Sequence, residues 1–206
     1  MIQQINIAKD YFYKKDYKQA FKIFSAEKDY YSAGLCAFLL KKPLSARKYW
    51  KKIPSCLASN WGLYVLDFIE LKTPIKKPTF FQTRAFLEIY INLLLENELI
   101  EWAQNLIASS DLLHQSNPES YKFIARALYA NGYFELAIVF CKRSLKLFYC
   151  DPEAFLILSQ CHYLLGDLGE ALDCINRVND IIDDYFPAIV FDKILRDEIK
   201  KKNETK

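Results

Sequence analysis

Glycine and proline are scarce in this sequence. The chain has only 5 Gly and 7 Pro in 206 residues, although these two residue types mark most of the tight turns that connect short strands. The composition therefore argues against a strand-and-turn protein and favours helices joined by short connections. Hydrophobic residues make up 52% of the chain and charged residues 26%, which excludes an intrinsically disordered chain.

Long apolar runs are also missing. The longest apolar stretches fall far short of the roughly 18 residues that span a bilayer, and the first fifteen residues lack the apolar segment of a signal peptide. We therefore expect a cytoplasmic protein without membrane contact. The 6 cysteines form no C-x-x-C pair, so we expect reduced, structural thiols, with disulfides or a reactive thiol as the alternative. A net charge of +3 and a pI of about 8.4 are too mild for a nucleic-acid-binding domain.

Residues that could perform catalysis are few. Of the 2 histidines, His114 lies at a predicted helix end and His162 on a helix stripe, where a packing role is the simpler interpretation. No glycine-rich phosphate loop and no zinc-type Cys/His spacing occurs. Several carboxylates fall at solvent-side joints and are interpreted as solvated charges: Glu98, Glu101, Asp183 and Asp184. The sequence therefore predicts no enzyme, no metal and no cofactor.

Two consecutive segments, 118–151 and 152–185, repeat one pattern at an interval of 34 residues. Self-similarity at such a period indicates stacked helical hairpins. A bundle of unrelated antiparallel helices would also be amphipathic, but it would not repeat the same small and large positions. The matched pairs are Pro118 with Pro152, Tyr121 with Phe155, Ile124 with Leu158, Gly132 with Gly166, and Ala137 with Ala171.

The rest of the chain divides into similar pieces. Residues 1–71 are predicted as degenerate hairpin repeats, 72–79 as an irregular connection, 80–185 as three repeats, and 186–206 as a capping helix with a frayed tail. The individual helices are expected at 2–14, 17–27, 29–41, 43–53, 56–71, 80–96, 118–131, 134–148, 152–165, 168–183 and 185–202. Ala103 and Ile107 mark a further return helix. The helix at 56–71 either lacks a return helix or pairs directly with the helix at 80–96.

The last predicted helix, 185–202, shows the half-polar pattern of a cap. It is expected to turn Ile189, Ile194, Leu195 and Ile199 towards the array, and the following residues from Lys200 to Lys206 are expected to fray.

The repeated positions resemble those of the tetratricopeptide repeat (TPR) family. The residues that carry the resemblance are Tyr121, Ile124, Ala125, Leu128, Ala137 and Cys141 in one copy, and Phe155, Leu158, Ser159, His162, Ala171 and Ile175 in the next. The resemblance implies an all-α fold, an α-α superhelix of stacked helical hairpins, that is, a TPR-like solenoid.

The same resemblance implies that the leading helices line a concave groove that holds a partner polypeptide. Asn92 and Gln160 would bond a peptide backbone, and Lys122 and Arg126 would meet a carboxylate. Tyr129 and Tyr163 would offer flat amphipathic contact. The implied function is a protein–protein interaction adaptor or scaffold, although these residues do not match the family's chaperone-tail clamp. The alternative is an ordinary solvated surface.

A second hypothesis is a structural, self-associating protein. The first hairpins are rich in aromatic residues, more than two short hairpins need to bury, and an exposed excess would form an adhesive patch. This hypothesis allows a homo-oligomer. The residues concerned are Tyr30, Tyr31, Tyr49, Trp50 and Trp61.

Overall fold

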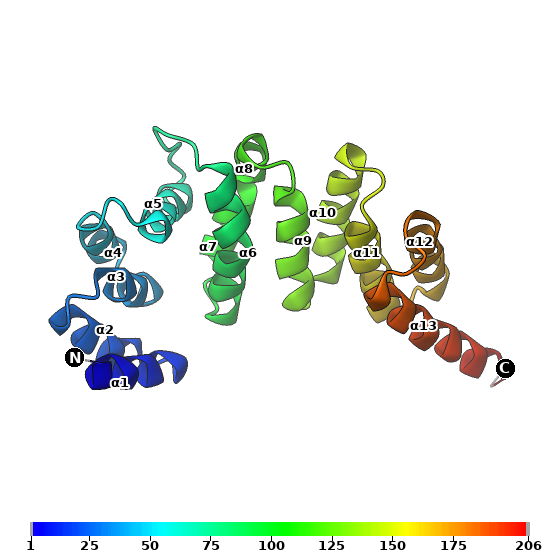
Figure 1. Ribbon diagram of the computed structural model, residues 1–206, viewed down its shortest axis with the longest axis horizontal. Coiled ribbons are helices and arrows are strands. Elements are labelled where there is room, and N and C mark those ends of the chain that lie inside the picture. The colour runs from blue at the N-terminus through cyan, green and yellow to red at the C-terminus, as the bar shows by residue number, and fades with distance from the viewer. Residues whose placement is uncertain (1, 205–206) are drawn as a thin grey trace. The chain divides into compact units, whose positions relative to one another are not determined.

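The computed structural model describes residues 2–204, and all regular structure in that range is α-helical (Figure 1). The fold class is therefore all-α, as predicted. Thirteen helices occur in the described range: α1 (Ile2–Tyr13), α2 (Tyr17–Ala26), α3 (Tyr30–Leu39), α4 (Pro43–Trp50), α5 (Leu57–Ile69), α6 (Phe80–Glu96), α7 (Ile100–Ala108), α8 (Ser110–Ser116), α9 (Ser120–Ala130), α10 (Phe134–Leu147), α11 (Pro152–Leu164), α12 (Leu168–Ile181) and α13 (Phe186–Glu204).

The chain forms two compact units. The first contains the chain up to Phe86 together with Leu93–Ser116, and the second contains Leu87–Asn92 and the chain from Asn117 onward. In the first unit α1 packs on α2, α2 on α3, α3 on α4 and α4 on α5; in the second, α9 to α13 pack in the same consecutive way. Each unit thus contains a stack of helices packed in consecutive order, as the repeats predict.

The hairpins turn through one recurrent backbone motif. A residue with positive φ follows the helix, and the next N–H donates to a carbonyl five residues back, as in the bonds from Asp16 to Tyr11 (2.9 Å) and from Asp167 to His162 (2.9 Å). This is the Schellman arrangement, which satisfies carbonyl groups at the helix end. It reverses the chain within few residues, so successive helices lie against each other.

Trp50 at the end of α4 is fully buried and, with Trp61, is one of the two largest buried side chains of the first unit. A Cβ atom added to Gly34 of α3 would lie 2.3 Å from its Nε1 atom, and one added to Gly62 of α5 would lie 2.7 Å from its Cζ3 atom. The indole N–H also donates to the carbonyl of Tyr31 (3.2 Å). Two glycines inside helices therefore make room for one indole ring that joins three helices.

Residues 70–79 form no helix, and α5 has no return helix of its own. Instead α5 packs on α3, α4 and α7. The Asn105 side chain of α7 donates to the carbonyl of Ile69 (3.0 Å), and the ring of Trp61 lies 6.3 Å from that of Phe86 near the start of α6. Of the two alternatives that the sequence left open, α5 thus lacks a return helix of its own, and it also has a ring contact with the start of α6.

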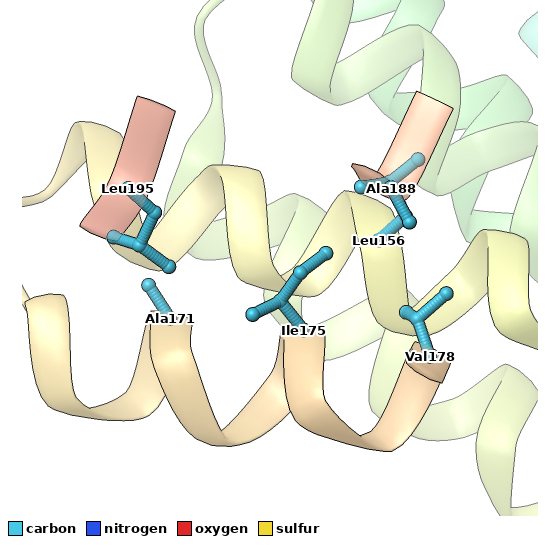
Figure 2. Packing of buried hydrophobic residues seen from close by; sticks show 6 residues of the cluster. All are labelled: Leu156, Ala171, Ile175, Val178, Ala188 and Leu195. Atoms are coloured by element: carbon cyan, nitrogen blue, oxygen red, sulfur yellow. The ribbon is translucent and has the colours of Figure 1, made fainter. Parts of the chain in front are cut away.

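In the second unit, α11 and α12 cross closely at two small residues. The hydroxyl of Ser159 donates to the carbonyl of Ala171 (2.6 Å), and both residues are fully buried. Figure 2 shows side chains of α12 facing Leu156 of α11 and two residues of α13. The whole cluster consists of Leu156, Ala171, Ile175, Val178, Ala188 and Leu195.

The orientation predicted for α13 is partly wrong. Leu195 is fully buried and Ile199 packs against the same cluster, but Ile189 and Ile194 are 48% and 49% exposed. Ala188 is fully buried and takes the inward place instead. The helix also continues to Glu204, beyond the predicted start of the frayed tail; residues 205–206 lie outside the described range.

The aromatic residues that motivated self-association are partly or fully buried. Trp50 and Trp61 are fully buried, and Tyr30, Tyr31 and Tyr49 are half-buried. The rings of Tyr30 and Tyr49 pack against each other and under the ammonium group of Lys52, which lies 4.6 Å from the ring centroid of Tyr30. Separately, no helix in the described part of the chain combines the length and the apolar character needed to cross a bilayer.

Candidate functional site

All six residues that the sequence nominates lie in the second unit, on α9, on α11 and on the 87–92 segment of α6. The local sequence fixes the start of α11 in two ways. The Asp151 side chain accepts hydrogen bonds from the backbone N–H groups of Glu153 and Ala154, both at 3.1 Å. Pro152 occupies the first helical turn, where its missing N–H is tolerated. Gly132 follows the end of α9 and Gly166 follows the end of α11, and both adopt the left-handed backbone conformation.

Lys122 lies inside the unit, with only 7% of its surface exposed. Its Nζ atom is 2.8 Å from Asp151, 3.2 Å from Glu153 and 3.4 Å from Glu119. Burial alone would lower the pKa of Lys122, but the hydrogen bonds and charges of Asp151 and Glu153 outweigh burial and raise it. The ammonium group therefore stays charged and ties α9 to the start of α11.

Arg126 bridges three helices, and 41% of its side chain is exposed. Its Nη1 atom lies 2.8 Å from Glu153 of α11 and its Nε atom 3.3 Å from Glu88 of α6. Burial is the main effect and raises the pKa of Glu88, and the nearby charge of Glu153 raises it further. Arg126 lowers the pKa of Glu88, but the overall shift is upward. The guanidinium group of Arg126 on α9 thus contacts Glu88 of α6 and Glu153 of α11 at the same time.

Asn92 is bonded to the end of α9. The side-chain Nδ2 of Asn131 donates to Oδ1 of Asn92 (2.7 Å) and to the carbonyl of Ala127 (2.8 Å). Asn92 is half-buried, and this bond uses its amide oxygen. Its NH₂ group is therefore the part of the side chain available to a peptide carbonyl.

The remaining three residues are half-buried and present flat or amide surfaces. The ring of Tyr129 lies 6.1 Å from that of Phe134, and burial raises the pKa of Tyr129. The ring of Tyr163 meets Phe191 of α13 edge-on at 5.5 Å. Gln160 lies one turn before Tyr163 on α11, and both are half-buried. Such groups suit contact with a polypeptide more than chemistry on a small substrate.

The structure therefore brings Arg126 together with Lys122 through their shared partner Glu153, and places Tyr163 against α13. Sequence reasoning did not nominate Asp151 or Glu153, which hold both cations. A usable signal was present: Asp151-Pro152 is a helix-start signature at the opening of the second repeat. The periodicity could not show that Lys122 is turned towards that start.

The described residues offer no evident catalytic group. His162 is largely buried, and its Nδ1 atom lies 3.5 Å from Asp167. No cluster of three or more His, Cys, Asp or Glu side chains with metal-binding geometry occurs in the described range. Cys36, Cys141, Cys161 and Cys174 are buried, and burial raises the pKa of each thiol.

No protein-family model and no curated protein matches this chain. Among solved structures, it is similar to the C-terminal part of a TPR repeat-containing protein from Cytophaga hutchinsonii, with 16% identity and a TM-score of 0.47, covering 93% of this chain and 69% of that one. It is also similar to YrrB, a TPR protein with an unusual peptide-binding site, with 14% identity and a TM-score of 0.46, covering 92% and 90%. Both similar structures are TPR proteins.

Proposed function

We propose that this chain is a non-catalytic protein-interaction adaptor that binds a polypeptide segment through the second unit. The binding surface, called here the leading-helix surface, consists of Asn92, Arg126, Tyr129, Gln160 and Tyr163. Lys122 is not part of this surface, because its ammonium group is buried and already paired with Asp151 and Glu153. It stabilises the surface by joining α9 to the start of α11. This assigns Lys122 a positioning role rather than direct contact with the partner.

The observation that carries the proposal is the bridge made by Arg126. It connects Glu88 of α6 and Glu153 of α11 across α9. Side chains of three leading helices are thereby held in place before any partner arrives. Binding then requires little further ordering of this surface, and ordering is one of the main costs of association.

The chemistry of the surface fits an extended backbone. The NH₂ group of Asn92 and the amide of Gln160 can each bond peptide carbonyl or N–H groups. Tyr129 and Tyr163 supply large rings with little conformational freedom, which is the character of residues that dominate protein interfaces. Such a surface selects a polypeptide through backbone contacts and a few side chains.

A displayed library of random peptides tests this proposal directly. Gln160→Arg places a longer charged side chain in the middle of the surface, at a half-buried position, and should reduce the enrichment of wild-type binders at least about tenfold. Gln104→Arg makes the same substitution at an exposed position of α7 in the first unit, and should leave enrichment unchanged.

Peptides that bind wild type and Gln160→Arg equally would refute the assignment of the surface. Failure to enrich any peptide on wild type would refute the adaptor function itself. Far-ultraviolet circular dichroism of both variants provides the folding check.

A further inference from the structure

The segment 71–81, between α5 and α6, exposes large apolar side chains to solvent. Ile75 is fully exposed (103%), and Leu71 and Phe81 are each 75% exposed. Phe80, at 41% exposed, meets Phe81 edge-on at 5.6 Å. Several large apolar side chains exposed within one short connection suit an external contact.

The same segment is basic. It contains Lys72, Lys76 and Lys77 and no Asp or Glu. Lys72 pairs with Glu70 at 2.6 Å, whereas Lys77 donates to the neutral side chain of Gln115. Lysines therefore alternate with the exposed apolar residues along the connection.

Neighbouring charges do not cancel this basic character. Arg47 of α4 lies 2.8 Å from Asp67 and 3.3 Å from Glu70. Arg47 and the three lysines of the segment, taken together with Asp67 and Glu70, carry a net charge of +2.

The segment is held in shape although it forms no helix. Pro74 and Pro78 are buried while the residues next to them are exposed. Thr79 and Gln82 form a reciprocal capping box that starts α6. A cleft of about 350 Å³ lies between the segment and α5, lined by Asn60, Leu63, Tyr64, Asp67, Pro74, Ile75 and Lys76. Buried prolines with fixed φ thus present the apolar tip and its lysines outward.

We propose that segment 71–81 is a contact site for anionic lipid surfaces. Its exposed apolar tip would enter the headgroup region while the flanking lysines meet lipid phosphates and carboxylates. Lysine is a compact point charge that suits diffuse, mobile anions, whereas paired recognition of a protein carboxylate favours arginine. A fully exposed isoleucine on a projecting connection also fits a deformable layer better than a rigid protein face. The expectation of no membrane contact rested on the length needed to span a bilayer, which such a surface contact does not require.

Sedimentation with lipid vesicles tests this site on the full chain. Wild type should bind vesicles in which about a third of the lipid is phosphatidylserine, should not bind pure phosphatidylcholine vesicles, and should be released by high salt. Ile75→Asp combined with Lys76→Glu and Lys77→Glu should reduce binding at least about tenfold, since each lysine near an anionic surface contributes about fivefold.

The matched control carries the same chemical changes in the second unit. Lys142→Glu, Lys146→Glu and Leu147→Asp alter two exposed lysines and one half-exposed leucine on α10, so the net charge changes equally. This control should keep wild-type binding. Separately, the tryptophan fluorescence added by Ile75→Trp, measured against wild type, should shift to shorter wavelength with phosphatidylserine vesicles only. The reason is that the new indole enters the lipid interface.

Several outcomes would overturn the lipid site. They are absence of phosphatidylserine-dependent binding by wild type, equal loss in the control, and full binding by the loop variant. If the chain binds a polyglutamate peptide through segment 71–81 but does not bind vesicles, the segment would be assigned to an acidic protein partner instead.

Discussion

The two units end several of their helices with the same backbone turn but place different residues at its strained position. In the second unit the positive-φ positions are Gly132 and Gly166. In the first unit they carry side chains: Lys15, Lys28, Lys41, Leu71 and Glu98, with φ between 55° and 59°. A residue with a Cβ pays roughly 1–2 kcal/mol in this region. The turns of the second unit are therefore encoded locally, whereas those of the first are imposed by the packing of the helices they join.

The glycines that contact a buried ring and those that adopt positive φ belong to different units. Gly34 and Gly62 of the first unit lie inside helices, against the indole of Trp50. Gly132 and Gly166 of the second unit lie at turns, with open space where a Cβ would be. The first unit thus depends on one large ring in a fitted space, and the second on regular turns. Each prediction below tests one side of this contrast.

The largest effect is expected from Trp50→Ala. Removing a fully buried indole between two glycines leaves a cavity that α3, α4 and α5 cannot close, so the free energy of unfolding should fall by about 3–5 kcal/mol. Urea unfolding followed by circular dichroism measures this loss. Tyr13→Ala, at an 80% exposed aromatic position of the same unit, should lose less than about 0.5 kcal/mol. Similar losses in both variants would contradict the central role of Trp50.

A smaller loss is expected from Lys122→Met in the second unit. Asp151 and Glu153 would lose their buried cation, and a hydrogen-bonded charged partner contributes about 1.5–3 kcal/mol. The pKa of Lys122 is raised above its ordinary value of 10.5 in the folded chain. Its stabilisation is therefore complete below that pH and is lost as pH rises through the raised pKa.

The stability difference between wild type and Lys122→Met should consequently stay constant through neutral pH and shrink in strongly alkaline solution. Urea unfolding across that range measures it. A difference that persists unchanged in strongly alkaline solution, where Lys122 is neutral, would show that Lys122 stabilises the unit by packing rather than by its charge.

Exchanging the turn residues should have opposite effects in the two units. Gly166→Ala should destabilise the second unit by about 1 kcal/mol, because alanine is strained at φ 84°. Lys41→Gly, at φ 56° in the first unit, relieves that strain and should raise the free energy of unfolding by up to about 1 kcal/mol. Thermal unfolding of the two variants beside wild type compares them. Destabilisation by Lys41→Gly would mean that the lysine side chain itself holds that turn.

The smallest effect concerns thiol reactivity. Burial alone would raise the pKa of Cys56, but the Ser59 hydroxyl and the N–H groups of Ala58 and Ser59 at the start of α5 lower it overall. The rate at which iodoacetamide labels Cys56 should therefore reach half its maximum at a pH below 9.0, the ordinary pKa of a cysteine thiol. Ser59→Ala should move that midpoint upward, and the buried thiols of the second unit should react only on unfolding. Mass spectrometry of tryptic peptides identifies the labelled residue, and an unchanged midpoint in Ser59→Ala would exclude the hydroxyl as a cause.

Much of the helical architecture was predictable because its signals are local. The small and large positions at 118–185 predict α9 to α12 within two residues at each end, since helix periodicity reflects backbone geometry alone. The short helix α8 (Ser110–Ser116) was not predicted as a separate element, because only Ser109 separates it from α7 and no glycine or proline marks the break. The strained turn at Lys41 was also invisible, because no local preference favours lysine there.

The candidate site shows the same division more sharply. The sequence by itself determined that α9 and α11 occupy equivalent places and carry Arg126 and Gln160 on equivalent positions. Only the tertiary structure decided that Lys122 is buried against Asp151, which lies 29 residues away in sequence, and that Ile194 is exposed while Leu195 is buried. A residue's place on its helix follows from a short-range repeat. Its burial and its charge partners depend on how closely neighbouring helices approach, which the side chains of several helices set together.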